Sequence, residues 1–592
     1  MNNTLTRKGH RCAIVPGYSP GPGTRWKKIA IMLGLMAIIL FKQNYAYAQQ
    51  VLNGTVLDER GSPLPGASIK IKGTERGTVS DVDGKFLLEV PSPETMVLIT
   101  YQGYFPLEVA VGNDREQTFT LQLDEEQSKL DEVVVVGFGT QKKVTVTGSV
   151  TSVSVKDLEM STAPSLSNAL AGRMPGIITR QTSGEPGYDQ AQVFIRGMGT
   201  WVSRTPLVLV DGVERGMSAL NSINAQEIES FSVLKDASAT AVYGVRGANG
   251  VILITTKRGV QGRPKVTLRS ETGLLTAQRM PKYIDGIEYA QLWNEAYRNM
   301  GQDEFFSPEE IAKYASGEDP YLYPNVDWTN EIMKKNTYQT INNLSVNGGT
   351  EIIRYYANVG YTEQSGLWKV DEGNPYNTNI NMRRYNLRSN IDVNVTKNLL
   401  FEFGLGAVVQ QGNYPARSAP DIFDALRKTP PISFPKENPD GTPAGITQFL
   451  GSNPWGMVTQ SGYLVQARNT VQGTFGGKWD LSEVITQGLS LNGRFAYDHY
   501  YQSDVRRQKD FEVKQYLGKD PVTGEDRYSE VLREATPLGY TTGNGAERVY
   551  YTELLANYTR SFGKHDVSGM LMYNQRDRVR LTAGESMLNL PY

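Results

Sequence analysis

Residues 385–405 read YNLRSNIDVNVTKNLLFEFGL, and the order of side chains in this stretch indicates the architecture of the longest part of the chain. Apolar and polar side chains alternate along it, and a turn at residues 396–398 divides it into two runs. In a strand, alternation with a period of two places the two kinds of side chain on opposite faces. Here the polar face carries the charges of Arg388, Asp392 and Glu402. The pattern predicts a hairpin of a transmembrane β-barrel, although a soluble β-sandwich also alternates.

Two further segments, residues 354–361 and 489–498, repeat the same alternation. Tyr361, Tyr385 and Tyr497 are expected at strand ends, where membrane barrels carry aromatic girdles. These tyrosines and the charged polar face favour the barrel over the sandwich. We therefore predict a mainly β protein with an antiparallel transmembrane β-barrel over residues 263–592.

The connections of this region also have a pattern. Residues 374–381 and 410–455 are rich in Tyr, Pro, Gly and Asn and are expected as extracellular loops, whereas residues 287–300 are expected as a helix within a loop or an insertion. The family resemblance described below implies a barrel of about 22 strands, each of ~10 residues. Residues 263–592 cannot supply that many, so we expect an incomplete barrel and a truncated chain.

The composition of the 592-residue chain excludes several classes of function. A net charge of -1 gives no basic surplus for binding nucleic acid. Cys12 is the only cysteine, and His10, His499 and His565 are the only histidines, so neither a disulfide framework nor a Cys/His metal site is expected. GxSxG, Walker A and HExxH motifs are absent from the sequence. We expect no enzyme activity, no catalytic residue, no metal and no cofactor.

Residues 1–48 have the order of a secretory signal peptide behind a short extension. Arg25, Lys27 and Lys28 precede the apolar run 29–41, and the small-residue site Ala46-Tyr47-Ala48 follows. The alternative is a transmembrane helix, but the run is shorter than the roughly 20 residues that a bilayer requires. We expect cleavage after Ala48 and export.

Residues 49–123 alternate with frequent turns, as a small β-sandwich does. Their motifs Gly54–Val56, Pro65–Ala67, Gly77–Asp81 and Asp83–Phe86 resemble the carboxypeptidase-regulatory-like domain. This resemblance implies a structural module. A peptidase is not expected, because the domain contains no histidine and no cluster of metal ligands.

A linker at residues 124–143 joins this sandwich to the next domain. An acidic stretch at residues 124–128 leads into four consecutive valines, Val133–Val136, followed by glycines. Valine favours strands, and a strand beside a linker can add to the edge of another protein's sheet. From its residues alone, the segment could equally be an edge strand of the next domain.

Residues 144–262 have an α+β pattern. Leu166, Ala169 and Leu170 stand at helical spacing, and Asn224 with Glu227 three residues later is typical of a capping box. Strand-like runs occur at 193–195, 207–210 and 251–255. We expect one compact domain.

Longer motifs in this part of the chain resemble a known family. The ordered segments Glu132–Gly139, Val193–Gly197, Pro206–Val213, Val233–Gly244 and Arg246–Thr256 are similar to the plug of SusC/RagA TonB-linked outer-membrane proteins. The resemblance implies a TonB box formed by Asp131, Glu132, Val133, Val134, Val135, Val136, Gly137, Phe138 and Gly139. It also implies a plug motif formed by Arg196, Gly197, Asp211, Gly212, Asp236, Tyr243, Gly244, Arg246, Asn249 and Gly250.

The resemblance further implies a function and partners. Arg196-Gly197 and Tyr243-Gly244 would lodge the plug in the barrel, or would only close turns and ion pairs within the plug. The family imports oligosaccharides or, less often, peptides through the outer membrane, with TonB and a SusD-like surface lipoprotein as partners. An outer-membrane signalling receptor is a weaker alternative. Tyr414, Trp455 and Tyr463 could stack on sugars, although loop aromatics more often pack or anchor.

Overall fold

The structure is a computed structural model. It describes residues 50–581 except residues 60, 75, 93, 113–115, 123–132, 137–138, 143–149, 200–203, 450–452 and 564. The expected signal peptide and Cys12 lie outside these residues. The chain divides into two compact units, of which the first contains residues 1–132 and 142–144 and the second contains residues 133–141 and 145–592.

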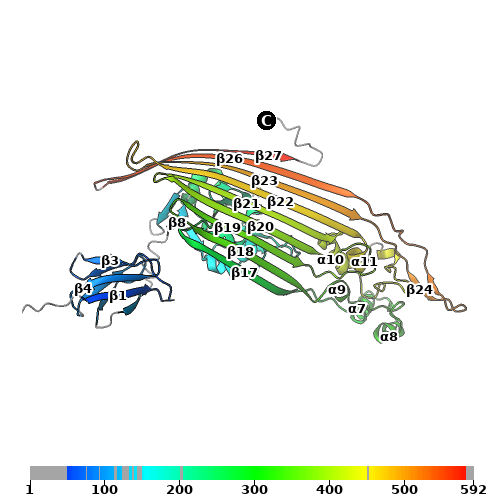
Figure 1. The fold of residues 1–592 in the computed structure, drawn as a ribbon. Coiled ribbons are helices and arrows are strands. Elements are labelled where there is room, and N and C mark those ends of the chain that lie inside the picture. Colours follow the sequence, from blue (N-terminus) through cyan, green and yellow to red (C-terminus); the bar gives the residue numbers. More distant parts are fainter. Residues whose placement is uncertain are drawn as a thin grey trace, which may run out of the picture. The chain divides into compact units, whose positions relative to one another are not determined.

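The first unit is a two-sheet sandwich. In strand β4, Phe86, Leu88 and Val90 are buried while Lys85 and Glu89 are exposed, so the alternation directs every second side chain into the core. Within the described residues the sheets have the orders β4-β1-β7 and β3-β2-β5-β6, and β1 runs antiparallel to β4 and parallel to β7 (Figure 1). The strands are β1 (Gln50–Leu57), β2 (Ser68–Ile71), β3 (Gly77–Val79), β4 (Lys85–Val90), β5 (Met96–Thr100), β6 (Leu107–Ala110) and β7 (Glu116–Thr120).

The α+β region of the second unit, called the plug below, contains one mixed sheet with the order β10-β15-β16-β13-β14 and a separate hairpin, β11-β12. Its strands are β10 (Val150–Val153), β11 (Ile177–Gln181), β12 (Ala191–Ile195), β13 (Leu207–Val210), β14 (Val213–Glu214), β15 (Ile228–Leu234) and β16 (Val251–Thr256). Its helices are α3 (Val155–Glu159), α4 (Leu166–Ala169), α5 (Gly216–Ser222), η2 (Ala225–Glu227), α6 (Ala237–Thr240) and η3 (Ala241–Gly247).

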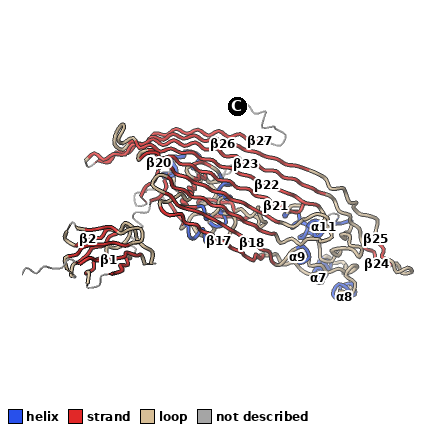
Figure 2. The backbone as a smooth tube through the Cα atoms, viewed as in Figure 1, coloured by secondary structure: helices blue, strands red, loops and turns tan. Residues whose placement is uncertain are grey.

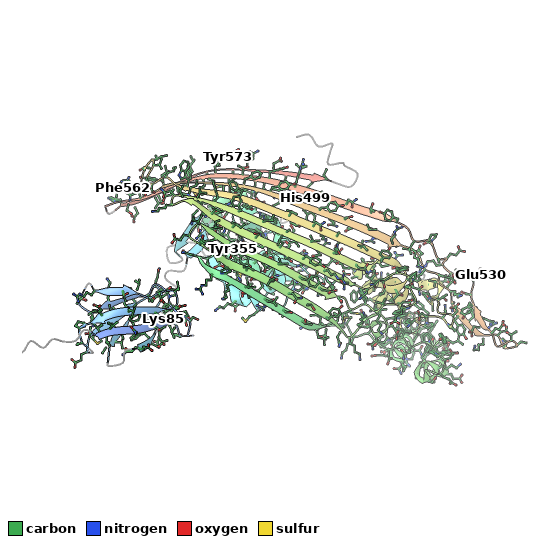
Figure 3. All side chains as sticks on the ribbon, viewed as in Figure 1. Lys85, Tyr355, His499, Glu530, Phe562 and Tyr573 are labelled. Atoms are coloured by element: carbon green, nitrogen blue, oxygen red, sulfur yellow. The ribbon has the colours of Figure 1, made fainter. Side chains whose placement is uncertain are left out.

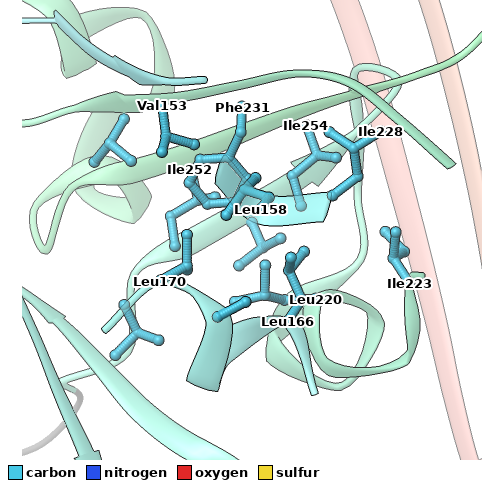
Figure 4. Close-up of a cluster of buried hydrophobic side chains, with 14 of the residues drawn as sticks. Val153, Leu158, Leu166, Leu170, Leu220, Ile223, Ile228, Phe231, Ile252 and Ile254 are labelled. Carbon is cyan, nitrogen blue, oxygen red and sulfur yellow. The ribbon is translucent and has the colours of Figure 1, made fainter. Parts of the chain in front are cut away.

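The plug has its own hydrophobic core. Leu158 and Leu220 come from the helices and Ile228, Phe231 and Ile252 from the central strands, and all five are fully buried. Figure 4 shows these side chains gathered in one cluster. Strand β16 is buried along almost its whole length, and its first four residues, 251–254, form a continuous apolar run, as expected for a central strand covered on both faces. The predicted α+β fold of this region is confirmed.

From Gly262 onward the chain forms one large antiparallel sheet. In the described residues its order is β17-β18-β19-β20-β21-β22-β23-β26-β27, and the plug lies against one face of it (Figures 1 and 2). The strands are β17 (Gly262–Thr276), β18 (Asn336–Gly349), β19 (Ile353–Ser365), β20 (Asn381–Thr396), β21 (Leu399–Pro415), β22 (Gly462–Asp480), β23 (Leu489–Gln508), β26 (Thr541–Phe562) and β27 (His565–Leu581). Strands β24 (Tyr516–Lys519) and β25 (Asp526–Tyr528) pair with each other.

The hairpin predicted from residues 385–405 is present as β20 and β21. Its register pairs Ile391 with Phe403 and Asp392 with Glu402, so the charges share one face as expected. Side chains stand on both faces of the large sheet (Figure 3).

Burial on the two faces is the reverse of that in a soluble sandwich. Tyr385, Leu387 and Ile391 are 47%, 41% and 38% exposed, whereas Arg388 and Asp392 on the opposite face are 4% and 5% exposed. A soluble sheet hides its apolar face. A membrane barrel turns that face to lipid and its polar face to the lumen. The mainly β, barrel-like fold is thus confirmed and the sandwich reading of this region is excluded.

Strand length differs from the sequence prediction. The sheet's strands contain 13 to 22 residues, not ~10. At about 3.3 Å per residue, the longest extends well beyond a hydrocarbon layer of about 30 Å. Tyr361, Tyr385 and Tyr497 therefore lie inside their strands, four or more positions from either end, and not at the ends as predicted.

The strand connections separate into short turns at one end of the sheet and long segments at the other. The long ones form what we call the cap, whose described residues are 277–335, 366–380, 416–449, 453–461 and 509–540. It contains α7 (Gly286–Asn299), as expected, with α8 (Pro308–Ser316), α9 (Trp328–Ile332), α10 (Ala419–Lys428), η4 (Thr447–Phe449) and α11 (Pro454–Thr459). Residues 410–415, expected in a loop, belong to β21.

The cap packs around a hydrophobic cluster, called the cap core below. Its members are Trp328, Ile332, Trp368, Ile380, Tyr414, Ile422, Ala425, Leu426, Phe434, Ala444, Trp455, Met457, Val458, Phe511 and Val513. Most come from the loops, and Tyr414 comes from the end of β21. No described helix is both long and apolar enough to cross a bilayer.

The exposed apolar face of β20 predicts where an added charge would destabilise the sheet. Ile391→Arg should lower the free energy of unfolding in lipid vesicles by about 2–4 kcal/mol, because it puts a charge against hydrocarbon. Val395 lies on the same face of β20 beside the turn, so Val395→Arg should cost about 0–1 kcal/mol. Urea titration measures both. Equal costs at the two positions would contradict the lipid-facing assignment.

Candidate functional site

The segment predicted as the TonB box is partly described. Val133–Val136 form strand β8, which pairs with β9 (Gly139–Lys142) and contacts β15 of the plug. Asp131, Glu132, Gly137 and Phe138 lie outside the described residues. The segment can form a strand, as the valines predict, and its role as a TonB contact stays a prediction.

Arg196 and Gly197 of the predicted plug motif make a tight turn within the plug. Arg196 has a φ of 56° and Gly197 a φ of 97°, both in the left-handed region. The guanidinium of Arg196 forms an ion pair with the carboxylate of Asp236, another motif residue. The structure therefore places this part of the motif in an internal ion pair.

Asp211 and Gly212 lie where the plug meets the large sheet. Asp211, with a φ of 52°, accepts hydrogen bonds from the backbone N–H of Thr256 at 2.8 Å and from its hydroxyl at 2.9 Å. A Cβ at Gly212 would lie 2.4 Å from a guanidinium nitrogen of Arg494 in β23. Only glycine allows this close approach, so Gly212 lets the barrel arginine reach the plug backbone.

The remaining motif residues lie around η3. Tyr243 packs against the apolar cluster of Leu209, Leu234, Val251 and Leu253. Arg246 pairs with Glu214 at 2.8 Å, and Glu214 also lies 3.3 Å from Arg576 of β27. Asn249 donates to the Thr205 carbonyl at 3.4 Å, and Gly244 and Gly250 have positive φ. Through Glu214, this part of the motif connects to the large sheet.

A buried ion pair, not predicted from the sequence, joins plug and sheet. Glu227 accepts a hydrogen bond from the Arg388 guanidinium at 3.1 Å and from the Asn358 amide at 3.3 Å. The side chains of Glu227 and Arg388 are 2% and 5% exposed. Burial raises the pKa of the Glu227 carboxyl, and the facing guanidinium opposes that rise.

The capping-box prediction for this turn was half right. Asn224 caps a single 3₁₀ turn, and its side-chain oxygen accepts a hydrogen bond from the backbone N–H of Gln226 at 3.0 Å. Glu227 turns instead to the sheet and binds Arg388. The signal available in the sequence was Arg388 on the polar face of its strand, which requires a partner away from lipid.

Two more arginines connect the plug to the sheet. Arg215 binds Asp498 at 3.1 Å and the Thr474 hydroxyl at 2.8 Å, and its side chain is 2% exposed. Arg258, at the end of the plug, contacts Asp392 and lies 3.7 Å from Glu402. The polar face of the sheet therefore holds the plug by charged contacts at several places.

Residues 184–189, called the plug loop below, pack against β21 and β22. The Tyr188 hydroxyl lies 3.2 Å from the Gln466 side-chain oxygen, and the Arg468 guanidinium stands 4.9 Å from the centre of the Tyr188 ring. The Tyr414 hydroxyl donates to the Pro186 carbonyl at 3.0 Å. Burial raises the pKa of Glu185, in the same loop, to about 7.

Comparison with known proteins places this architecture in a family. The model of the "TonB-dependent Receptor Plug Domain" matches residues 142–251, and that of the "CarboxypepD_reg-like domain" matches residues 52–135. TonB-dependent receptor P26 of Formosa agariphila is 34% identical over 411 residues, covering 69% of this chain and 38% of that protein. TonB-dependent receptor SusC of Bacteroides thetaiotaomicron is 32% identical over 366 residues, covering 60% and 34%. The chain belongs to the SusC/RagA family of TonB-dependent receptors.

A solved structure agrees with this fold. The RagAB peptide importer in its "open-open" state aligns with a TM-score of 0.57 at 21% identity, covering 78% of this receptor and 51% of that chain. At this identity the likeness supports the fold alone. The receptor spans 38% and 34% of the lengths of P26 and SusC. Its relatives are receptors and not enzymes, in agreement with the sequence prediction.

The aromatic residues considered for sugar stacking are occupied by packing. Trp455 is 7% exposed, and its indole N–H donates to Glu437 at 2.7 Å. Tyr414 is 3% exposed in the cap core. The ring of Tyr463 lies 5.7 Å from that of Tyr376. Neither Trp455 nor Tyr414 offers a free ring face to a sugar.

The Glu227–Arg388 pair predicts a large mutational cost. Arg388→Met should destabilise the receptor by about 3–5 kcal/mol, because Glu227 would remain buried without its cation. Adding Glu227→Gln should restore much of the loss. Arg383→Met is the matched control, because Arg383 lies in the same strand and its pair with Glu363 is exposed, worth at most about 1 kcal/mol. Thermal unfolding in detergent measures all four proteins, and a stable Arg388→Met single variant would refute the prediction.

The raised pKa of Glu185 predicts a pH-dependent plug loop. A carboxyl whose folded pKa is raised contributes stability below its unfolded value, near 4.5, and loses it as pH rises through about 7. Amides of residues 184–189 should therefore exchange hydrogen faster at pH 8 than at pH 5.5, after correction for intrinsic rates. Glu185→Gln should remove the difference, and Glu229→Gln at an exposed plug position should leave it unchanged. A difference that survives Glu185→Gln would contradict the assignment.

Proposed function

We propose that this receptor serves the TonB-dependent import of a large nutrient through the outer membrane. The observation that carries the proposal is the polar face of the large sheet, which is occupied by a plug with its own hydrophobic core. Any solute that passes along this face must displace or rearrange the plug. The contacts that resist such movement are charged, so an energy source is required.

The segment 131–139 is the proposed point where TonB delivers that energy. Its valines form a strand, and an extended segment offers backbone donors and acceptors to the edge of a partner's sheet. The segment precedes the first plug strand, β10, so a force applied to it reaches the plug directly. The plug motif residues are proposed to set the internal geometry of the plug and, through Glu214 and Gly212, its seating.

The proposed substrate class is an oligosaccharide, with a peptide as the alternative. The family resemblance favours glycans, whereas RagAB is described as a peptide importer. A SusD-like surface lipoprotein is the proposed partner. This partner is proposed from the resemblance to the SusC/RagA family.

Replacing Val134 and Val136 by proline tests the TonB contact. Proline removes two backbone donors and should abolish growth on the imported substrate while surface binding of that substrate persists. Val134→Thr with Val136→Thr is the control, because threonine keeps both N–H groups and the preference for strands. Growth of the proline variant at the wild-type rate would refute the assignment.

A further inference from the structure

Tyr414 makes contacts in both the cap core and the plug loop. Its ring is part of the cap core, where it packs in the same cluster as Ile422 and Trp455 and is 3% exposed. Its hydroxyl leaves that core and donates a hydrogen bond of 3.0 Å to the carbonyl of Pro186 in the plug. One side chain at the end of β21 thus connects the packing of the cap with the backbone of the plug loop.

The plug loop is shaped to receive this side chain. Gly187 has a φ of 81°, and a Cβ at that position would lie 2.5 Å from the Tyr414 hydroxyl oxygen. Tyr188 meets the Tyr414 ring edge-on, with the ring centres 5.2 Å apart. The loop and Tyr414 therefore fit each other in one arrangement, and a shift of the ring would disturb several contacts together.

Two other tyrosines donate a similar hydroxyl-to-carbonyl hydrogen bond, but neither links the cap core to the plug. Tyr356 donates from the large sheet to the Gln226 carbonyl of the plug at 3.1 Å but is no member of the cap core. Tyr376 donates to the Gln460 carbonyl at 2.8 Å, with both residues in the cap. Among these three tyrosines, only Tyr414 combines the cap core with a plug contact.

We propose that Tyr414 is a positioning residue that couples the packing of the cap to the conformation of the plug loop. A well-packed cap core fixes the ring, the fixed ring presents its hydroxyl to Pro186, and the plug loop is held docked. Loosening of the cap core moves the ring and weakens that hold. By the reciprocity of coupled equilibria, release of the plug loop also loosens the cap.

A double-substitution cycle tests the coupling in the intact receptor. Ile422 is fully buried in the cap core, so Ile422→Ala perturbs the cap without touching the plug. We expect it to speed hydrogen exchange of the plug-loop amides, notably that of Tyr188, about fivefold or more. Tyr414→Phe alone should also speed exchange. In the Tyr414→Phe background, Ile422→Ala should add little.

Two matched controls separate coupling from general loosening. Tyr356→Phe and Tyr376→Phe each remove one hydroxyl-to-carbonyl bond, and the plug-loop response to Ile422→Ala should persist in both. If Ile422→Ala prevents folding, Ile422→Val gives a smaller perturbation with the same expected dependence on Tyr414. The proposal is overturned if the cap substitution leaves plug-loop exchange unchanged, or if the response is equal in the presence and absence of the Tyr414 hydroxyl. The assay needs neither TonB nor substrate, so its failure leaves the import proposal standing.

Discussion

Charge on the inner face of a membrane sheet needs a partner, and this requirement organises the second unit of the receptor. The outer face of β20 is apolar and exposed, so its inner face must hold Arg388 and Asp392 away from lipid. Glu227 and Arg258 of the plug supply the opposite charges. Burying one member of such a pair alone would cost several kcal/mol. Plug and sheet therefore depend on each other for electrostatic compensation.

Much of the fold could be predicted because it follows from local periodicity. The alternation in residues 385–405 specified the hairpin, its turn and the face that carries charge, and the pairing of Asp392 with Glu402 agrees. The α+β character of the plug followed from short apolar runs bounded by turn residues. Strand length could not be predicted from periodicity, because strands that continue past the membrane lose the strict apolar alternation of their lipid-facing part.

The contacts between elements were harder to predict than the elements themselves. Sequence alone showed that Arg388 needed a partner but could not identify Glu227, which lies 161 positions away and was assigned to a capping box. The cap core could not be predicted for the same reason. Trp328, Trp368 and Trp455 come from three separate loops, and the sequence of each loop gives no sign of the other two. In the plug motif, the sequence identified the residue types, and the left-handed turns at Arg196 and Asp211 supply a structural reason for their neighbouring glycines.

The order of strands in the plug determines how it would yield under tension. Strand β10 is the first plug strand after the β8–β9 segment, and among the described strands its one neighbour in the sheet is β15. At the other end of the domain, β16 is flanked by two strands and leads directly to Arg258, which is anchored to the wall by Asp392. A pulling force applied at the amino-terminal side would detach β10, which pairs with one strand, before it reached β16, which pairs with two. The plug would therefore unfold stepwise from its amino-terminal side, while its carboxyl-terminal end stayed bound to the sheet through Arg258 and Asp392.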